Sequence, residues 1–146
     1  MKGKILVMGL PGAGKTWLAE RLAVEWQCAW FNADRVRSMA NDWDFSPEAR
    51  LRQAERMRNI ADFEKSKGRR VICDFVCPTL ETRETFDADY VIFLDTIKEG
   101  RFENTNKLFE SPVGYEGNMW RVDKFYSDDE IKEMARKISH IIDAVS

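Results

Sequence analysis

The sequence has few residues of the kinds that build metal centres or disulfide frameworks. Its 146 residues include one histidine, His140, and three cysteines. An odd number of cysteines, without the spacing of a small disulfide-rich scaffold, argues against a disulfide framework. Cys73 and Cys77 would need further ligands to hold a metal, and His140 lies far along the chain near its C-terminus. We therefore expect reduced thiols in the core of a cytoplasmic protein.

The chain also lacks a long apolar run and an excess of one charge. No apolar stretch is long enough to span a bilayer, and the apolar run at the start has no small-residue cleavage site. A formal net charge of -2 disfavours bulk binding of nucleic acid. No repeat, low-complexity tract or linker divides residues 1–146. We expect one domain in the cytoplasm, without a membrane partner.

Apolar segments alternate with helical patterns along the chain. Continuous apolar runs predict strands at 4–9, 29–31, 70–75, 90–95 and 119–123. Apolar spacing and capping residues predict helices at 16–27, from Ser46 to Gly68, from Thr79 and from Ser127 onward. The apolar stripes of these helices include Val24, Phe63 and Ile141 as candidate inward residues.

This order of elements predicts a fold class. Because a crossover through a helix leads back to a parallel strand, we expect a three-layer α/β/α fold with a parallel sheet of about five strands. The polar stretch at about 98–118 is broken by Pro112 and by glycines, and it predicts a loop or lid. Ligands of such sheets bind at the carboxyl ends of the strands.

Residues 9–16 carry the strongest chemical signal. They read GLPGAGKT and match the Walker A pattern G-x-x-x-x-G-K-[ST] completely, between an apolar strand and a helix. Glycines let backbone N–H groups point at phosphate oxygens, and the start of the next helix adds its positive end. Lys15 would reach the β- and γ-phosphates, and the Thr16 hydroxyl would bind Mg²⁺. The predicted ATP contacts are Gly9, Pro11, Gly12, Ala13, Gly14, Lys15 and Thr16.

A phosphate loop alone does not distinguish a kinase from a GTPase or a mechanical ATPase. The base-reading pattern N-K-x-D of GTPases is missing, since Asn106-Lys107 is followed by Leu108 and Phe109. The small size of the chain and its lid-like segment favour a P-loop kinase, which moves the terminal phosphoryl group of ATP onto a hydroxyl.

Beyond this loop, the chain resembles the adenylylsulfate kinase (APS kinase) family, which phosphorylates the 3′-hydroxyl of adenosine 5′-phosphosulfate. The similarity runs from Ile5 to about Asp95. Residues 32–37 (NADRVR) match the family pattern D-G-D-N-x-R, residues 44–50 (DFSPEAR) match G-F-S-x-x-D-R, and residues 75–78 (FVCP) match F-[IV]-S-P. The resemblance implies an ATP- and Mg²⁺-dependent kinase of sulfate assimilation, with a homodimer as one candidate assembly.

The resemblance also implies where the acceptor binds. Two arginines would hold an anionic group by bidentate hydrogen bonds, and Phe45 would stack on the acceptor's base. Taken alone, the arginines would be ordinary surface charges and Phe45 a core residue at the foot of a helix. The predicted acceptor contacts are Arg37, Phe45, Arg50, Gln53, Phe75 and Lys107.

Two carboxylates end predicted strands beside the phosphate loop. Asp34 could take the proton of the acceptor hydroxyl or hold Mg²⁺ through water, or it could be the N-cap of a helix from Val36 onward. Asp74 resembles a Walker B carboxylate for Mg²⁺. We therefore predict Lys15 and Asp34 as catalytic, and Thr16, Asp34 and Asp74 as metal ligands.

Several departures from the family pattern leave the acceptor open. The first aspartate of the family is Asn32 here, its asparagine is Arg35 and its F-S-P serine is Cys77, and the lid is short. The partners predicted are ATP and a small anionic or nucleotide-like acceptor. An APS kinase or close relative, a kinase for another nucleoside, nucleotide or nucleic-acid hydroxyl, and a nucleotide-dependent switch without transfer remain as alternatives.

Overall fold

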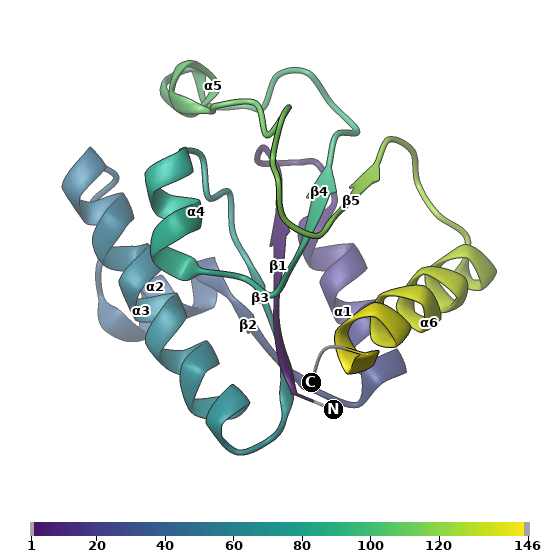
Figure 1. The fold of residues 1–146 in the computed structure, drawn as a ribbon. Helices are drawn as coiled ribbons and strands as arrows, with labels where there is room; N and C mark the ends of the chain where they lie inside the picture. The colour runs from purple at the N-terminus through teal and green to yellow at the C-terminus, as the bar shows by residue number, and fades with distance from the viewer. Residues whose placement is uncertain (1, 145–146) are drawn as a thin grey trace.

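A parallel sheet of five strands forms the centre of the fold (Figure 1). The computed structural model describes residues 2–144. The strands are β1 (Gly3–Met8), β2 (Ala29–Asn32), β3 (Arg70–Asp74), β4 (Tyr90–Leu94) and β5 (Met119–Val122). Their order across the sheet is β2-β3-β1-β4-β5, and each neighbouring pair is parallel. The predicted sheet is confirmed.

Helices cover both faces of the sheet. They are α1 (Lys15–Trp26), α2 (Ala33–Ala40), α3 (Pro47–Ser66), α4 (Leu80–Phe86), α5 (Glu103–Leu108) and α6 (Asp128–Ala144). Helices α1 and α6 lie on one face, and α3 and α4 lie on the other with α2 beside α3 (Figure 1). The predicted three-layer fold is confirmed. Helix α2 begins at Ala33, earlier than the helix from Val36 onward that the sequence offered as an alternative.

Side chains of β1 alternate between the two faces, as the pleat of a strand requires. Ile5 and Val7 pack with α1 and α6, whereas Leu6 and Met8 pack with α3 and α4. Since both faces are covered, every residue of β1 is buried. This apolar core holds the carboxyl ends of β1 and β3 in a fixed register, with Val7 opposite Asp74.

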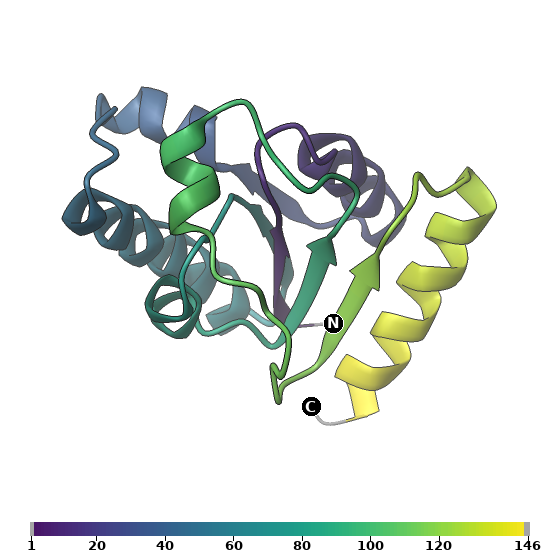
Figure 2. The same ribbon diagram turned by 90° about the horizontal axis from the view of Figure 1, so that it is seen from above.

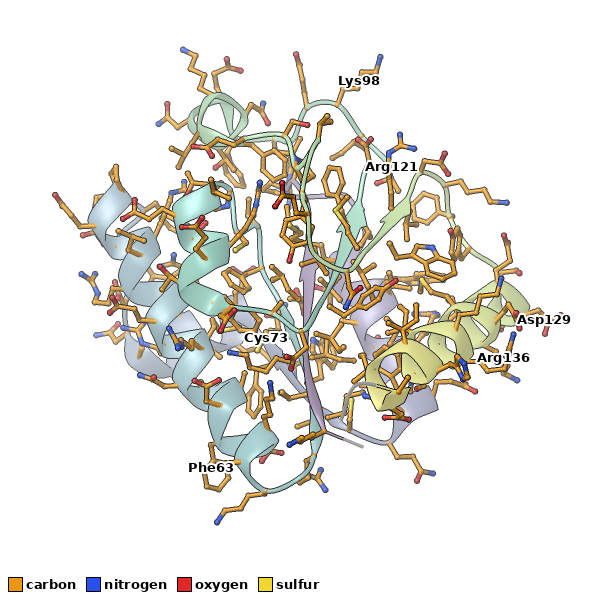
Figure 3. The ribbon with its side chains drawn as sticks, in the orientation of Figure 1. Phe63, Cys73, Lys98, Arg121, Asp129 and Arg136 are labelled. Atoms are coloured by element: carbon orange, nitrogen blue, oxygen red, sulfur yellow. The ribbon has the colours of Figure 1, made fainter. Side chains whose placement is uncertain are left out.

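The capping signals of α3 are confirmed, but some expected inward residues are not. The Ser46 hydroxyl accepts a hydrogen bond from the Ala49 N–H at 3.2 Å, and Pro47 begins the helix. Phe63 projects from the far end of α3 into solvent (Figure 3), and Val24 of α1 is exposed too. In α6, Ile142 is buried in place of Ile141, because the buried positions follow the helical period from Ile131.

The lid segment at 98–118 is more ordered than a loop. It contains α5, which lies above α3 and α4 at the carboxyl edge of the sheet (Figures 1 and 2). Gly100 packs tightly against the phosphate loop, because an added Cβ would lie 3.0 Å from the Pro11 carbonyl oxygen. Just after α5, the Glu110 N–H donates to the Pro78 carbonyl at 2.6 Å. The segment is therefore anchored on both sides of α5.

The cysteines behave as the sequence predicts. Cys28, Cys73 and Cys77 are free, and burial raises the pKa of Cys28 to about 11 and of Cys77 to about 12. Residues 2–144 contain no group of three or more His, Cys, Asp and Glu side chains that could hold a metal. Within the same range, no helix has the length and apolar character needed to cross a membrane.

Candidate active site

The phosphate loop joins β1 to α1 at the carboxyl edge of the sheet. Gly14 is the N-cap of α1 with φ of 102°, a left-handed conformation that glycine adopts without strain. No side chain caps this helix, so its first N–H groups remain available to an anion. Gly9 leaves no space for a larger residue, because a Cβ there would lie 2.8 Å from the Leu94 carbonyl oxygen. The geometry fits the predicted cradle for phosphates.

Lys15 lies within this loop and is largely buried. Its Nζ donates a hydrogen bond to the Leu10 carbonyl at 3.0 Å. Burial lowers the pKa of Lys15 to about 8, while the charges of Asp74 and Asp34 act in the opposite direction. Both carboxylates are therefore close enough to influence the lysine. This proximity is the arrangement that the sequence predicts for the catalytic centre.

Asp74 ends β3 beside the phosphate loop and is 2% exposed. The Trp30 Nε1–H donates to its Oδ2 at 2.5 Å, and the Asn32 amide donates to its Oδ1 at 3.1 Å. The same Asn32 amide donates to the Thr16 hydroxyl at 3.2 Å. Burial raises the pKa of Asp74, and these hydrogen bonds act against that rise.

This donor set suits Mg²⁺. The ion prefers oxygen ligands and is held in phosphoryl-transfer sites by one or two protein oxygens together with substrate phosphates and water. The Thr16 hydroxyl and the Asp74 carboxylate supply such oxygens, and Asn32 joins them. A larger cluster of ligating side chains is not needed for this mode of binding.

Asp34 lies in a different environment from Asp74. It is exposed in the first turn of α2. The N-cap of that helix is Asn32, whose Oδ1 accepts a hydrogen bond from the Arg35 N–H at 3.1 Å, so the N-cap alternative for Asp34 is wrong. Burial lowers the pKa values of Lys15 and Arg37, and the negative charge of Asp34 acts against this lowering at both residues.

Three of the predicted acceptor residues lie together. Phe45 is 50% exposed, so it is not a core residue. The guanidinium carbons of Arg37 and Arg50 lie 4.5 Å and 5.6 Å from the centre of its ring. Arg37 donates to the carbonyls of Asp42 and Asp44, which fixes the turn before Phe45.

The other predicted acceptor residues have separate surroundings. Gln53 is buried, and its amide donates to the Ala33 carbonyl and accepts from Arg56. Phe75 is buried and packs edge-on against Phe86 at 5.5 Å. Lys107 is exposed on α5. Contact of these residues with an acceptor stays a prediction, and both Gln53 and Phe75 have structural roles besides.

The structure also brings residues to the site that sequence reasoning missed. Thr105 of α5 accepts a hydrogen bond from Arg50 at 3.3 Å, which joins the lid to the acceptor side. Asp42 binds Arg52 and Arg56 at 2.8 Å and 3.0 Å and so ties the turn before Phe45 to α3. Trp30 could have been found, because residues two apart on a strand share a face and Asn32 occupies the position of the first aspartate of the family pattern. No local pattern marks Thr105.

Comparison with known proteins identifies related sequences. A family model described as adenylylsulphate kinase matches residues 2–95. A curated relative, a probable adenylyl-sulfate kinase from Aeropyrum pernix, is 36% identical over 88 residues, which cover 54% of this chain and 46% of the relative. The chain therefore spans about half the length of the curated relatives it matches.

Solved structures of kinases share the fold. An APS kinase of Mycobacterium tuberculosis in complex with AMPPNP and APS aligns with a TM-score of 0.69 and 15% identity, covering 97% of this chain and 98% of that one. An unliganded sugar kinase from a Janibacter species aligns with a TM-score of 0.73 and 19% identity, covering 100% and 99%. At these identities the likeness shows the fold alone.

Proposed function

Because the chain belongs to the adenylylsulphate kinase family, we propose that it transfers the terminal phosphoryl group of ATP to a hydroxyl of a small anionic acceptor, namely adenylylsulfate. The reaction would then be a step of sulfate assimilation. Three features support the proposal: the family match, the phosphate loop with Lys15, and a cationic, aromatic surface around Phe45.

The residues of the chain divide the work of the transfer. The loop amides and the start of α1 bind the phosphates, and Lys15 neutralises charge that develops on the transferring group. Thr16 and Asp74 would hold Mg²⁺, which supplies charge neutralisation on the phosphate oxygens when bound. Asp34, exposed in the first turn of α2, accepts the proton of the acceptor hydroxyl as it attacks.

The main observation that supports an anionic acceptor is a pair of arginines, Arg37 and Arg50, that have no carboxylate partner among the described residues. Within residues 2–144, neither Arg37 nor Arg50 forms an ion pair, whereas Arg52 and Arg56 are both paired with Asp42. Burial lowers the pKa values of Arg37 and Arg50, so each cation is held at a cost in hydration. Two such cations beside an exposed aromatic ring suit an acceptor that carries both an anionic group and a base.

A second candidate is a kinase for another hydroxyl, such as that of a nucleoside, a nucleotide or a nucleic-acid end. The short lid favours this alternative. The α5 helix of this segment carries one exposed lysine, Lys107. Because the segment is anchored at Gly100 and Glu110, little of it is free to fold over a large acceptor.

The decisive experiment is a coupled assay of ADP release with ATP, Mg²⁺ and a panel of acceptors. The panel contains adenylylsulfate, adenosine and an oligonucleotide with a 5′-hydroxyl. Strong stimulation by adenylylsulfate alone is the expected result. If another acceptor stimulates ADP release instead, adenylylsulfate is the wrong acceptor but the phosphoryl-transfer reaction stands. Slow ATP hydrolysis that no acceptor stimulates would favour a nucleotide-dependent switch.

A matched pair of phenylalanine variants tests the acceptor surface. Phe45→Ala should raise the KM for adenylylsulfate, because base stacking contributes about 1–3 kcal/mol, or roughly 5- to 150-fold. Phe63→Ala is the control, since Phe63 is also an exposed phenylalanine and lies at the far end of α3 (Figure 3). Equal effects of the two substitutions would remove Phe45 from the acceptor site.

A further inference from the structure

A chain of hydrogen bonds joins the ends of β2 and β3 to the start of α1. It runs from the Trp30 indole to Asp74, and from Asp74 through the Asn32 amide to the Thr16 hydroxyl. We infer that Asn32 and Trp30 are positioning residues that hold Asp74 as the metal-side carboxylate, and that Asp34 is thereby left to serve the acceptor. The inference rests on the proposed phosphoryl transfer and divides its two carboxylates between two tasks.

The orientation of the Asn32 side chain is set by its partners. Its Oδ1 accepts the Arg35 N–H at the start of α2, so that oxygen cannot face β3. Its Nδ2 therefore faces Asp74 and Thr16, at 3.1 Å and 3.2 Å. Asn32 and Asp74 are also register partners of two parallel strands, which keeps their side chains side by side.

An aspartate could not replace Asn32 without cost. The second oxygen of its carboxylate would take the place of Nδ2 and lie near 3.1 Å from the Asp74 oxygen, where two negative charges repel. The family pattern has an aspartate at this position, and this chain has an amide there together with a carboxylate on β3. We therefore expect positions 32 and 74 to accommodate one carboxylate between them but not two.

The surroundings of Asp74 indicate a site built for a cation. Its hydrogen-bond donors, Trp30 and Asn32, are both neutral. Among the described residues 2–144, no Lys or Arg forms an ion pair with it, although it is 2% exposed. A buried carboxylate without a paired cation is costly, unless an ion binds it. The two N–H donors fix both oxygens, which is how partners of a ligand tune a metal site.

Asp34 offers the contrast. It is exposed on α2, and the cap of that helix does not depend on its side chain. It follows Asn32 by two residues in the first turn of α2, and its charge acts on both Lys15 and Arg37. Within residues 2–144 no hydrogen bond or ion pair holds the Asp34 carboxylate, whereas both oxygens of Asp74 are oriented by N–H donors.

The test measures metal binding without any transfer. Mn²⁺ is titrated into the full chain with ADP, and free Mn²⁺ is followed by electron paramagnetic resonance. We expect Asp74→Asn and Trp30→Phe to weaken Mn²⁺ binding roughly 10- to 100-fold, while Asp34→Asn leaves it within a factor of about three. Equal weakening by Asp34→Asn, or wild-type binding by Asp74→Asn, would overturn the assignment.

A reciprocal exchange tests the pair itself. Asn32→Asp alone should lower the melting temperature of the unliganded protein, because it places a second carboxylate oxygen near 3.1 Å from the Asp74 oxygen. The double variant Asn32→Asp/Asp74→Asn has one carboxylate again and should recover the melting temperature.

The two readouts separate this inference from the proposed function. Mn²⁺ and ADP binding need no acceptor, so an error about adenylylsulfate leaves the titration interpretable. Failure of the wild type to bind Mn²⁺ with ADP would reject the kinase proposal and this inference together. If Asn32→Asp does not fold, the titrations of Asp74→Asn and Trp30→Phe still decide. A double variant as unstable as Asn32→Asp would overturn the pairing.

Discussion

The two sides of the site hold their charges in opposite ways. On the phosphate side, Lys15 and Asp74 are largely buried, and burial moves both pKa values toward the neutral form. On the acceptor side, Asp42 is neutralised by paired arginines, and those pairs hold its pKa well below the usual range. On the phosphate side neither Lys15 nor Asp74 has an ion-pair partner among residues 2–144, whereas on the acceptor side Asp42 is neutralised in advance and only Arg37 and Arg50 are left for the charge of a ligand.

This contrast follows from the elements that carry the residues. The phosphate side consists of strand ends and a tight loop whose backbone is fixed by the core, so its few side chains have little freedom. The acceptor side consists of the turn between α2 and α3, which has no core of its own and is held by arginine hydrogen bonds. We expect substitutions on the first side to affect turnover and those on the second to affect acceptor affinity.

The largest effect is expected for Lys15→Ala. Removal of the charge next to the transferring phosphoryl group should lower kcat about a thousandfold or more, with an unchanged circular dichroism spectrum. Steady-state kinetics with ATP and the accepted substrate measure this change. Near-wild-type turnover in a folded variant would show that Lys15 does not act in the transfer step.

The next largest effect is expected for Asp34→Asn. Loss of the proton acceptor should reduce kcat roughly 100- to 1,000-fold, because a base acts in the transition state. The KM for ATP should stay nearly constant, since the phosphates are bound by the loop. A normal kcat with a raised KM for ATP would show that Asp34 belongs to the phosphate side.

Arg50→Ala should affect the acceptor side alone. A charge-assisted hydrogen bond contributes about 1.5–3 kcal/mol, so the KM for adenylylsulfate should rise roughly 10- to 150-fold with ATP binding unchanged. Arg58→Ala is a matched control on the same helix, because Arg58 pairs with exposed Asp62. Similar KM changes in both variants would point to general loss of helix stability.

The smallest effect is the pH dependence of ATP binding. With a pKa of about 8, Lys15 loses its proton as the pH rises from 7 to 9, and the cation that meets the phosphates is lost. The Kd for ATP, measured by calorimetry, should therefore rise roughly tenfold over this range. Lys15→Ala should bind weakly and without this dependence. A parallel dependence in the variant would assign the titration to another group.

The predicted phosphate loop and strands depend on local patterns, and this is why they could be predicted from the sequence. An apolar run such as 4–9 indicates burial on both faces, and GLPGAGKT contains within eight residues the chemistry of the cradle. The family resemblance likewise extends over the segment that the family model matches. The structure of the segment 98–118 was harder to predict, because its short helix α5 has no apolar face and contacts the site through Thr105.

The roles of the polar residues needed the tertiary structure. The sequence by itself determined the parallel α/β fold, the nucleotide-binding loop and the candidates Asp34 and Asp74. Only the tertiary structure decided that Asn32 caps α2 and also donates a hydrogen bond to Asp74. The same holds for the hydrogen bond that Arg50 donates to Thr105. The physical reason is that strand register and helix docking are set by many long-range contacts across the whole core. A hydrogen bond forms only when its two atoms are placed to within a few tenths of an ångström, and local sequence patterns do not fix positions so finely.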